Sequence, residues 1–265
     1  MKKNLSFQNK NIGYHLRGEG MPVMLVHGFG EDHRVWDEQC AQLEKRFRLI
    51  LPDLPGSGSS ERTADVSMEN LAASLHAILQ EESVDSLTML GHSMGGYVTL
   101  AFAAQYPDTL QAFGLVHSTA YADNEEKKVT RRKGIEFIKK NGVHEFFKTT
   151  DPNLFSEHTK RHNPGLIDTL INTYKDMDAD SLVAYYEAMM ERPDRTAVLK
   201  EFTRPILFLA GEHDTAIPYD QVMQQSRLPL LSYLHVLRQS GHMGMWEEPN
   251  QCTHTLEEFI KNNVL

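Results

Sequence analysis

The pentapeptide at residues 91–95, with the sequence G-H-S-M-G, constrains the fold more than any other part of this chain. Residues 86–90 before it are mostly apolar and β-prone, whereas residues 96–104 after it have the pattern of a buried helix. A G-x-S-x-G sequence between a strand and a helix predicts a tight, strained turn, because the flanking glycines let the two elements approach closely. We therefore expect Ser93 to present its hydroxyl at the carboxyl edge of a sheet.

Two backbone N–H groups are expected to face the oxygen that gains charge when Ser93 attacks a carbonyl. Met94 opens the predicted helix, where partial positive charge accumulates. An apolar strand expected at residues 22–26 runs into H-G-F-G at residues 27–30, a loop that supplies a second donor in serine hydrolases. We predict that the N–H groups of Phe29 and Met94 form an oxyanion hole.

Two later strands, expected at residues 205–210 and 232–237, are followed by an acid and a base. Asp214 comes after the first strand and His242 after the second. The carboxyl ends of parallel strands meet at one edge of a sheet, so both side chains are expected near Ser93. This order predicts Ser93 as nucleophile, His242 as general base and Asp214 as the acid that orients the imidazole.

Other residues are weaker candidates for the base and the acid. They are His27, His92 and His213 for the base and Asp123 and Asp194 for the acid. The first two histidines lie inside the motifs, and the third adjoins Asp214 instead of ending a separate strand. Either aspartate would serve only if Asp214 were misplaced.

The alternation of strands and helices predicts an α/β fold with a mostly parallel central sheet flanked by helices. An N-terminal hairpin is expected from the strand-like residues 5–8 and 12–16. Residues 118–199 are helical in pattern and contain no strand-like run, which predicts an inserted helical cap. We accordingly expect a core of residues 1–117 and 200–265.

The expected cap begins with a charged segment at residues 125–133. A solvated helix face is the favoured interpretation, and a basic patch that binds an anionic substrate is the alternative. Large apolar residues of the cap either line a pocket or form the cap's own core. They are Phe137, Phe146, Phe147, Phe155, Tyr185, Tyr186, Met189 and Met190.

Composition excludes several classes of function. A net charge of −9 argues against a nucleic-acid partner, and no stretch is apolar enough to span a membrane or to act as a signal peptide. We expect a cytoplasmic protein in which Cys40 and Cys252 are buried free thiols. No cofactor or metal is expected, because Glu61 replaces the third glycine of a nucleotide loop and His158 and His162 lack a third ligand.

Taken together, these motifs resemble the α/β-hydrolase fold family over essentially the whole chain. Residues 53–59 are similar to that family's loop after an early strand, and residues 241–249 to its C-terminal histidine loop and final helix. A serine at the elbow is similar to esterases, lactonases, carbon–carbon bond hydrolases and cofactor-free haloperoxidases, whereas epoxide hydrolases and haloalkane dehalogenases have aspartate there. The resemblance implies hydrolysis of a small-molecule ester with a small to medium acyl group, because the oxyanion loop lacks a Gly-Gly-Gly run.

Two alternatives remain open at this point. One is a carbon–carbon bond or enol-lactone hydrolase acting on ring-cleavage products, which predicts cationic cap residues in the pocket, with Arg192 and Arg195 as candidates. The other is a small-molecule sensor that binds a ligand with little turnover. The sequence does not determine the oligomeric state.

Overall fold

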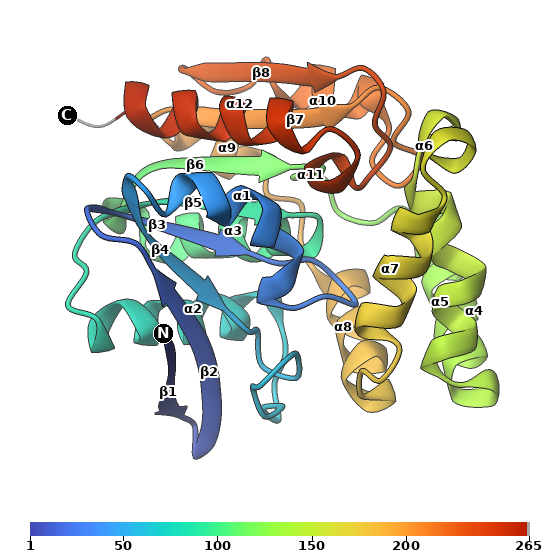
Figure 1. The fold of residues 1–265 in the computed structure, drawn as a ribbon. Helices are drawn as coiled ribbons and strands as arrows, with labels where there is room; N and C mark the ends of the chain where they lie inside the picture. The colour runs from blue at the N-terminus through green and yellow to red at the C-terminus, as the bar shows by residue number, and fades with distance from the viewer. Residues whose placement is uncertain (264–265) are drawn as a thin grey trace.

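The computed structural model, which describes residues 1–263, contains one eight-stranded sheet flanked by helices (Figure 1). The strand order is β1-β2-β4-β3-β5-β6-β7-β8. The strands are β1 Lys2–Phe7, β2 Lys10–Arg17, β3 Met21–Val26, β4 Phe47–Pro52, β5 Leu87–His92, β6 Leu110–Val116, β7 Ile206–Gly211 and β8 Ser232–Leu237. From β4 to β8 all neighbours are parallel, and only the first two pairings are antiparallel. The prediction of a mostly parallel α/β sheet is confirmed.

Helices cover both faces of this sheet (Figure 1). Those outside the long insertion are α1 Asp37–Leu43, α2 Met68–Glu81, α3 Met94–Gln105, α10 Tyr219–Gln225, α11 Gly244–Glu247 and α12 Pro249–Asn262. Helices α1 and α12 pack together on one face, while α2 and α3 pack together on the other. Short 3₁₀ helices are η1 His33–Trp36, η2 Pro107–Thr109 and η3 Asp151–Leu154.

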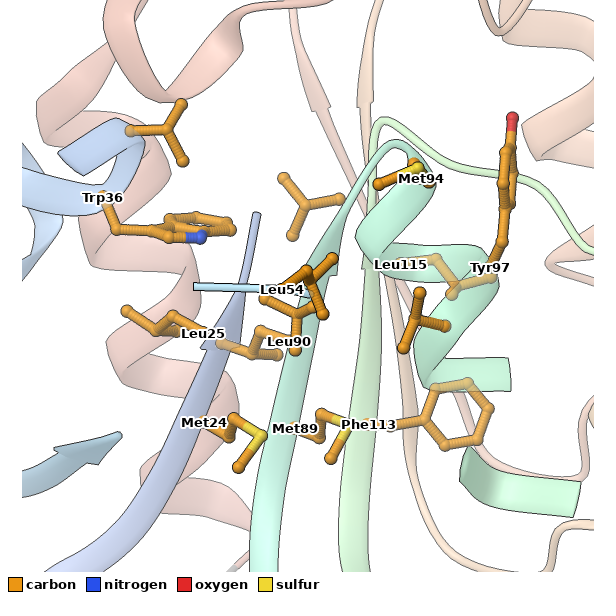
Figure 2. Close-up of a cluster of buried hydrophobic side chains, with 14 of the residues drawn as sticks. Met24, Leu25, Trp36, Leu54, Met89, Leu90, Met94, Tyr97, Phe113 and Leu115 are labelled. Atoms are coloured by element: carbon orange, nitrogen blue, oxygen red, sulfur yellow. The ribbon is translucent and has the colours of Figure 1, made fainter. Parts of the chain in front are cut away.

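The central strands are mostly apolar because both of their faces are covered. All six residues of β5 and all six of β7 are buried. Figure 2 shows Met24, Met89 and Phe113 from three neighbouring strands packed side by side. This rigid core holds the carboxyl ends of β3, β5 and β7 at one edge of the sheet.

The predicted N-terminal hairpin forms, but its strands are longer than expected and its turn lies at residues 8–9. Strands β1 and β2 pair antiparallel, with Phe7 opposite Lys10, and the connecting residues Gln8 and Asn9 have positive φ angles of 52° and 60°. Such left-handed residues are characteristic of two-residue hairpin turns. The hairpin extends the sheet on the side away from β7 and β8.

A helical insertion separates β6 from β7 (Figure 1). Its helices are α4 Glu125–Asn141, α5 Val143–Thr150, α6 Glu157–His162, α7 Gly165–Tyr174, α8 Ala179–Glu191 and α9 Thr196–Glu201. The structure describes this interval in full and places no strand in it. Among residues 1–263, no helix has the length and apolar character needed to cross a membrane.

Candidate active site

Ser93 occupies a strained turn between β5 and α3. Its φ and ψ angles are 51° and −115°, a combination that is costly for a residue with a side chain. The turn is closed by close packing, because a Cβ on Gly91 would lie only 2.3 Å from the carbonyl oxygen of Gly95. The backbone therefore has the geometry expected of G-x-S-x-G, and it leaves Ser93 partly exposed at the edge of the sheet.

Three predicted site residues from distant parts of the chain are joined by hydrogen bonds. Oγ of Ser93 lies 2.9 Å from Nε2 of His242. On the other side of the ring, Nδ1 of His242 lies 2.8 Å from Oδ2 of Asp214. The imidazole can therefore accept the serine proton on one nitrogen while it donates to a carboxylate from the other.

The Asp214 carboxylate is buried and receives several hydrogen bonds. Its Oδ1 accepts from the N–H groups of Ala216 and Ile217, both at 2.8 Å, and its Oδ2 also lies 3.3 Å from Nδ1 of His117. Burial raises the pKa of Asp214, but the neighbouring His242 and His117 outweigh burial and lower it below the ordinary value. The carboxylate is thus held in its charged form.

His242 is held by both the sheet edge and the insertion. Burial lowers its pKa, yet Asp214 raises it more, so the pKa of His242 lies above the usual 6.5. The backbone N–H of His242 donates to the carbonyl oxygen of Leu154 in η3 at 2.6 Å. The insertion therefore contributes directly to the position of the imidazole.

The loop after β3 lies against Ser93, as the proposed oxyanion hole requires. A Cβ on Gly28 would come within 3.2 Å of the Ser93 Cβ. Among residues 1–263, the N–H groups of Phe29 and Met94 donate no hydrogen bond to a backbone group outside the regular helices and strands. Their roles as oxyanion donors stay a prediction.

Sequence reasoning missed Glu31, which is buried directly beneath this loop. One of its oxygens, Oε2, accepts the Gly28 N–H at 2.7 Å and lies 3.0 Å from Nδ1 of His92. The other nitrogen of His92 lies 3.1 Å from the carbonyl oxygen of His242. The buried Glu31–His92 pair thus connects the loop after β3 to the loop that carries His242. In the sequence, the position of Glu31 directly after H-G-F-G is the feature that could have identified it.

A cavity of about 530 Å³ opens beside Ser93 and His242. Residues of the insertion form much of its wall, including Tyr186 and Met189, which the sequence left undecided between pocket and core. A smaller cavity of about 90 Å³ lies next to it, between Phe29, Phe146 and Phe147. The larger volume suits a small organic ligand.

Four of the five weaker candidates for base and acid lie away from the cavity, whereas His92 lines it and is hydrogen-bonded to Glu31. His27 is buried and accepts the Leu54 N–H, while His213 and Asp194 are exposed. Asp123 is paired with Arg131 and Arg192. None of these four side chains lines the cavity beside Ser93.

The prediction that Arg192 and Arg195 are cationic cap residues of the pocket was wrong. Arg192 is buried, pairs with Asp123 at 2.8 Å and stacks 3.8 Å from the ring centre of Tyr97, while Arg195 pairs with Glu69. Neither lines the cavity that contains Ser93. The cations that do line it are Lys127 and Arg131, so the interpretation of residues 125–133 as a fully solvated face is also wrong in part.

Within the described residues 1–263, two groups of histidine and carboxylate atoms come close enough together to be considered for a metal. One is His117, Asp214 and His242, whose facing atoms already form hydrogen bonds with one another. The other group is His15, His33 and Asp53, in which the two histidine rings are stacked 3.7 Å apart and nearly parallel. Their lone pairs lie in two nearly parallel planes, so they do not converge on one point beside Asp53. Neither arrangement fits a metal ion well.

Known proteins resemble this chain in both sequence and structure. The profile of the family described as alpha/beta hydrolase fold matches residues 21–249. An esterase from Thermogutta terrifontis superposes with a TM-score of 0.93 and 29% identity, covering 99% of each chain. The 3-oxoadipate enol-lactonase 1 of Acinetobacter baylyi is 23% identical over 96% of this chain and 95% of its own.

Some relatives match only locally. An uncharacterized protein of Mycobacterium tuberculosis is 35% identical over 104 residues, which is 39% of this chain and 30% of that protein. The match therefore spans less than a third of the length of this curated relative.

Proposed function

The chain belongs to the α/β hydrolase fold family, and on this basis we propose that it is a serine hydrolase that cleaves carboxylic esters of small to medium acyl groups. The observation that carries the proposal is the hydrogen-bonded series Ser93, His242 and Asp214, with distances of 2.9 and 2.8 Å. The likeness to an esterase at 29% identity supports it. We further propose that residues 118–199 act as a cap over the site and that residues 1–117 and 200–265 form the catalytic core.

The proposed reaction has two acyl-transfer steps. His242 takes the Ser93 proton as Oγ attacks the ester carbonyl, and the imidazolium then protonates the departing alcohol. A water molecule next loses a proton to His242 and attacks the acyl-enzyme; the His242 imidazolium returns this proton to Oγ of Ser93 as the acid is released. Asp214 holds the imidazole in the required tautomer and stabilises its charged form.

The negative charge of each tetrahedral intermediate is assigned to the oxyanion site. Two N–H groups aimed at the same oxygen stabilise this charge without reorganising, because they are already in place. Met94 supplies its N–H from the first turn of α3, and Phe29 from the loop braced by Glu31. No side chain beyond Ser93, His242 and Asp214 is needed for proton transfer.

The proposal is tested by hydrolysis of p-nitrophenyl esters from acetate to decanoate. We expect wild type to hydrolyse the shorter members and Ser93→Ala to lose roughly 10⁴-fold or more in kcat. Ser232→Ala, which removes an exposed serine hydroxyl on β8, is the matched control and should retain activity. If wild type is no faster than Ser93→Ala on every ester, ester hydrolysis is the wrong reaction and ligand binding without turnover becomes the better hypothesis.

Lactone hydrolysis is a second candidate because a lactone is an internal ester and needs the same groups. The full-length similarity to an enol-lactonase favours this candidate. It is tested by pH-stat titration with simple γ- and δ-lactones, where opening releases acid. Turnover of lactones that is faster than that of open-chain esters of the same size would favour this assignment.

A further inference from the structure

The cavity beside Ser93 has one positively charged wall, which is formed by the start of α4. Lys127 and Arg131 both line this cavity. They are four residues apart on a helix, so they lie on the same face, one turn above the other. The mechanism proposed above uses neither of them, although both face the space where a substrate would sit.

Arg131 shares its carboxylate partner with a second arginine. Its Nε and Nη2 donate to the buried carboxylate of Asp123 at 2.5 and 3.3 Å, and the same carboxylate pairs with Arg192. One negative charge therefore faces two guanidinium groups. Within residues 1–263, Nη1 of Arg131 has no hydrogen-bond partner, which leaves it available to an acceptor in the cavity.

Lys127 adds a second cation without a carboxylate partner among residues 1–263. Its Nζ donates to the carbonyl oxygen of Ala216 at 3.1 Å, and an ammonium has three donors. The pKa of the proposed base, His242, is lowered by burial and raised by Asp214. The positive charge of Lys127 also acts to lower this pKa. Lys127 is therefore electrostatically close to the reacting groups.

Among residues 1–263, no ion pair joins the acidic groups that line the cavity to Lys127 or Arg131. Glu31 is already bound to His92 and to the Gly28 N–H. Glu126 lies at the cavity wall as well, but its side chain is exposed, where water screens its charge. Both cations can therefore contact an anionic group of a ligand.

We propose that Arg131 and Lys127 form a carboxylate-binding subsite and that the natural substrate is an ester or lactone with a free carboxylate a few atoms from the carbonyl. The proposal rests on the proposed hydrolase function and names its substrate class. Guanidinium and ammonium groups bind carboxylates through short, charge-assisted hydrogen bonds, which are stronger in a partly buried site. With one end bound on α4, the carbonyl at the other end is positioned against Ser93.

The test compares two esters of similar size, only one of which is charged. Monoethyl glutarate ends in a carboxylate, and ethyl 5-methylhexanoate carries an isopropyl group of similar size in its place. The measured quantity is the ratio of kcat/KM for the charged ester to that for the neutral ester. We expect wild type to favour the charged ester by about tenfold or more at low salt, and the preference to shrink as salt is added.

Variants assign the preference to individual side chains. Lys127→Met should reduce the ratio by about fivefold, and Arg131→Gln by about tenfold or more. Glu126→Gln removes the nearby negative charge and should raise the ratio by about twofold. Lys128→Met is the matched control, because Lys128 pairs with Glu125 and does not line the cavity, so its ratio should equal that of wild type.

Arg131→Gln also disturbs the ion pair with Asp123, so its folding must be checked by its melting temperature. Lys127→Met does not depend on that pair and keeps the test decisive if Arg131→Gln fails to fold. A wild-type ratio of one or less, or a ratio that is the same in Lys127→Met and wild type, would overturn the subsite. Loss of all ester hydrolysis in wild type would instead contradict the proposed function, so the two failures are distinguishable.

Discussion

The carboxylate of Glu31 lies 3.0 Å from Nδ1 of His92, buried beneath the turn that carries Ser93. Burial raises the pKa of Glu31, but His92 and the Gly28 N–H outweigh burial and lower it below the usual value. The charged carboxylate therefore braces the loop that contains Phe29. This pair links three segments that are distant in sequence: the loop after β3, the serine turn and the histidine loop.

Replacing Glu31 by glutamine tests this brace. The substitution keeps the shape but removes the charge, so the Gly28 N–H and His92 lose their strongest acceptor. We expect kcat/KM for a p-nitrophenyl ester to fall by about tenfold and the free energy of unfolding to fall by about 1–3 kcal/mol. Glu38→Gln on the exposed face of α1 is the control. Wild-type values for both quantities in Glu31→Gln would show that the pair has no such role.

Asp214→Asn tests the assignment of the acid. Asparagine can still accept from the Ala216 and Ile217 N–H groups, so the loop should keep its shape. It cannot stabilise the imidazolium, and kcat should fall by about 10³- to 10⁴-fold. Asp220→Asn, an exposed change on α10, should have no effect. Full activity of Asp214→Asn would exclude this carboxylate as the orienting acid.

The pH dependence of kcat/KM should report His242. Only the neutral imidazole can accept the Ser93 proton, so activity should fall as the pH drops through the pKa of His242. Because Asp214 raises this pKa above 6.5, the midpoint of the acid limb should lie above pH 6.5. Any residual activity of Asp214→Asn should have a lower midpoint, since burial then acts without the opposing charge. A midpoint that is unchanged in this variant would point to another titrating group.

The glycines of the serine turn should be intolerant of even one added methyl group. In Gly91→Ala the new Cβ would lie 2.3 Å from a backbone oxygen of Gly95, and backbone cannot move aside cheaply. We expect a loss of more than about 3 kcal/mol in urea unfolding, or no folded protein. Gly165→Ala is the contrasting control, because nothing lies within 4 Å of the point that its new Cβ would occupy, and it should be neutral or stabilising by about 0.5 kcal/mol.

Much of the fold follows from local patterns in the sequence. Short apolar runs bounded by turn residues predicted β3, β5, β7 and β8; the bounds of β8 match the prediction, and those of the other three differ by at most two residues at either end. The burial of Cys40 and Cys252 also follows the prediction. Such patterns are reliable because the period of a strand or helix and the conformation of a glycine turn depend on near neighbours.

The sequence by itself determined the order Ser93, Asp214, His242 and their places just past strand ends, because parallel strands bring their carboxyl ends to one edge. Only the tertiary structure decided that Glu31 pairs with His92, that His117 contacts Asp214, and that Arg192 turns away from the cavity while Lys127 and Arg131 face it. The physical reason for the pairings is that a buried charge pairs with whichever group the packing brings near. The orientation of a helix with little apolar surface is not fixed by its own sequence, because either face can pack toward the core. Helix α4 has only two buried residues, Ile135 and Ile138, among its 17, so its orientation depends on how the insertion packs over the sheet.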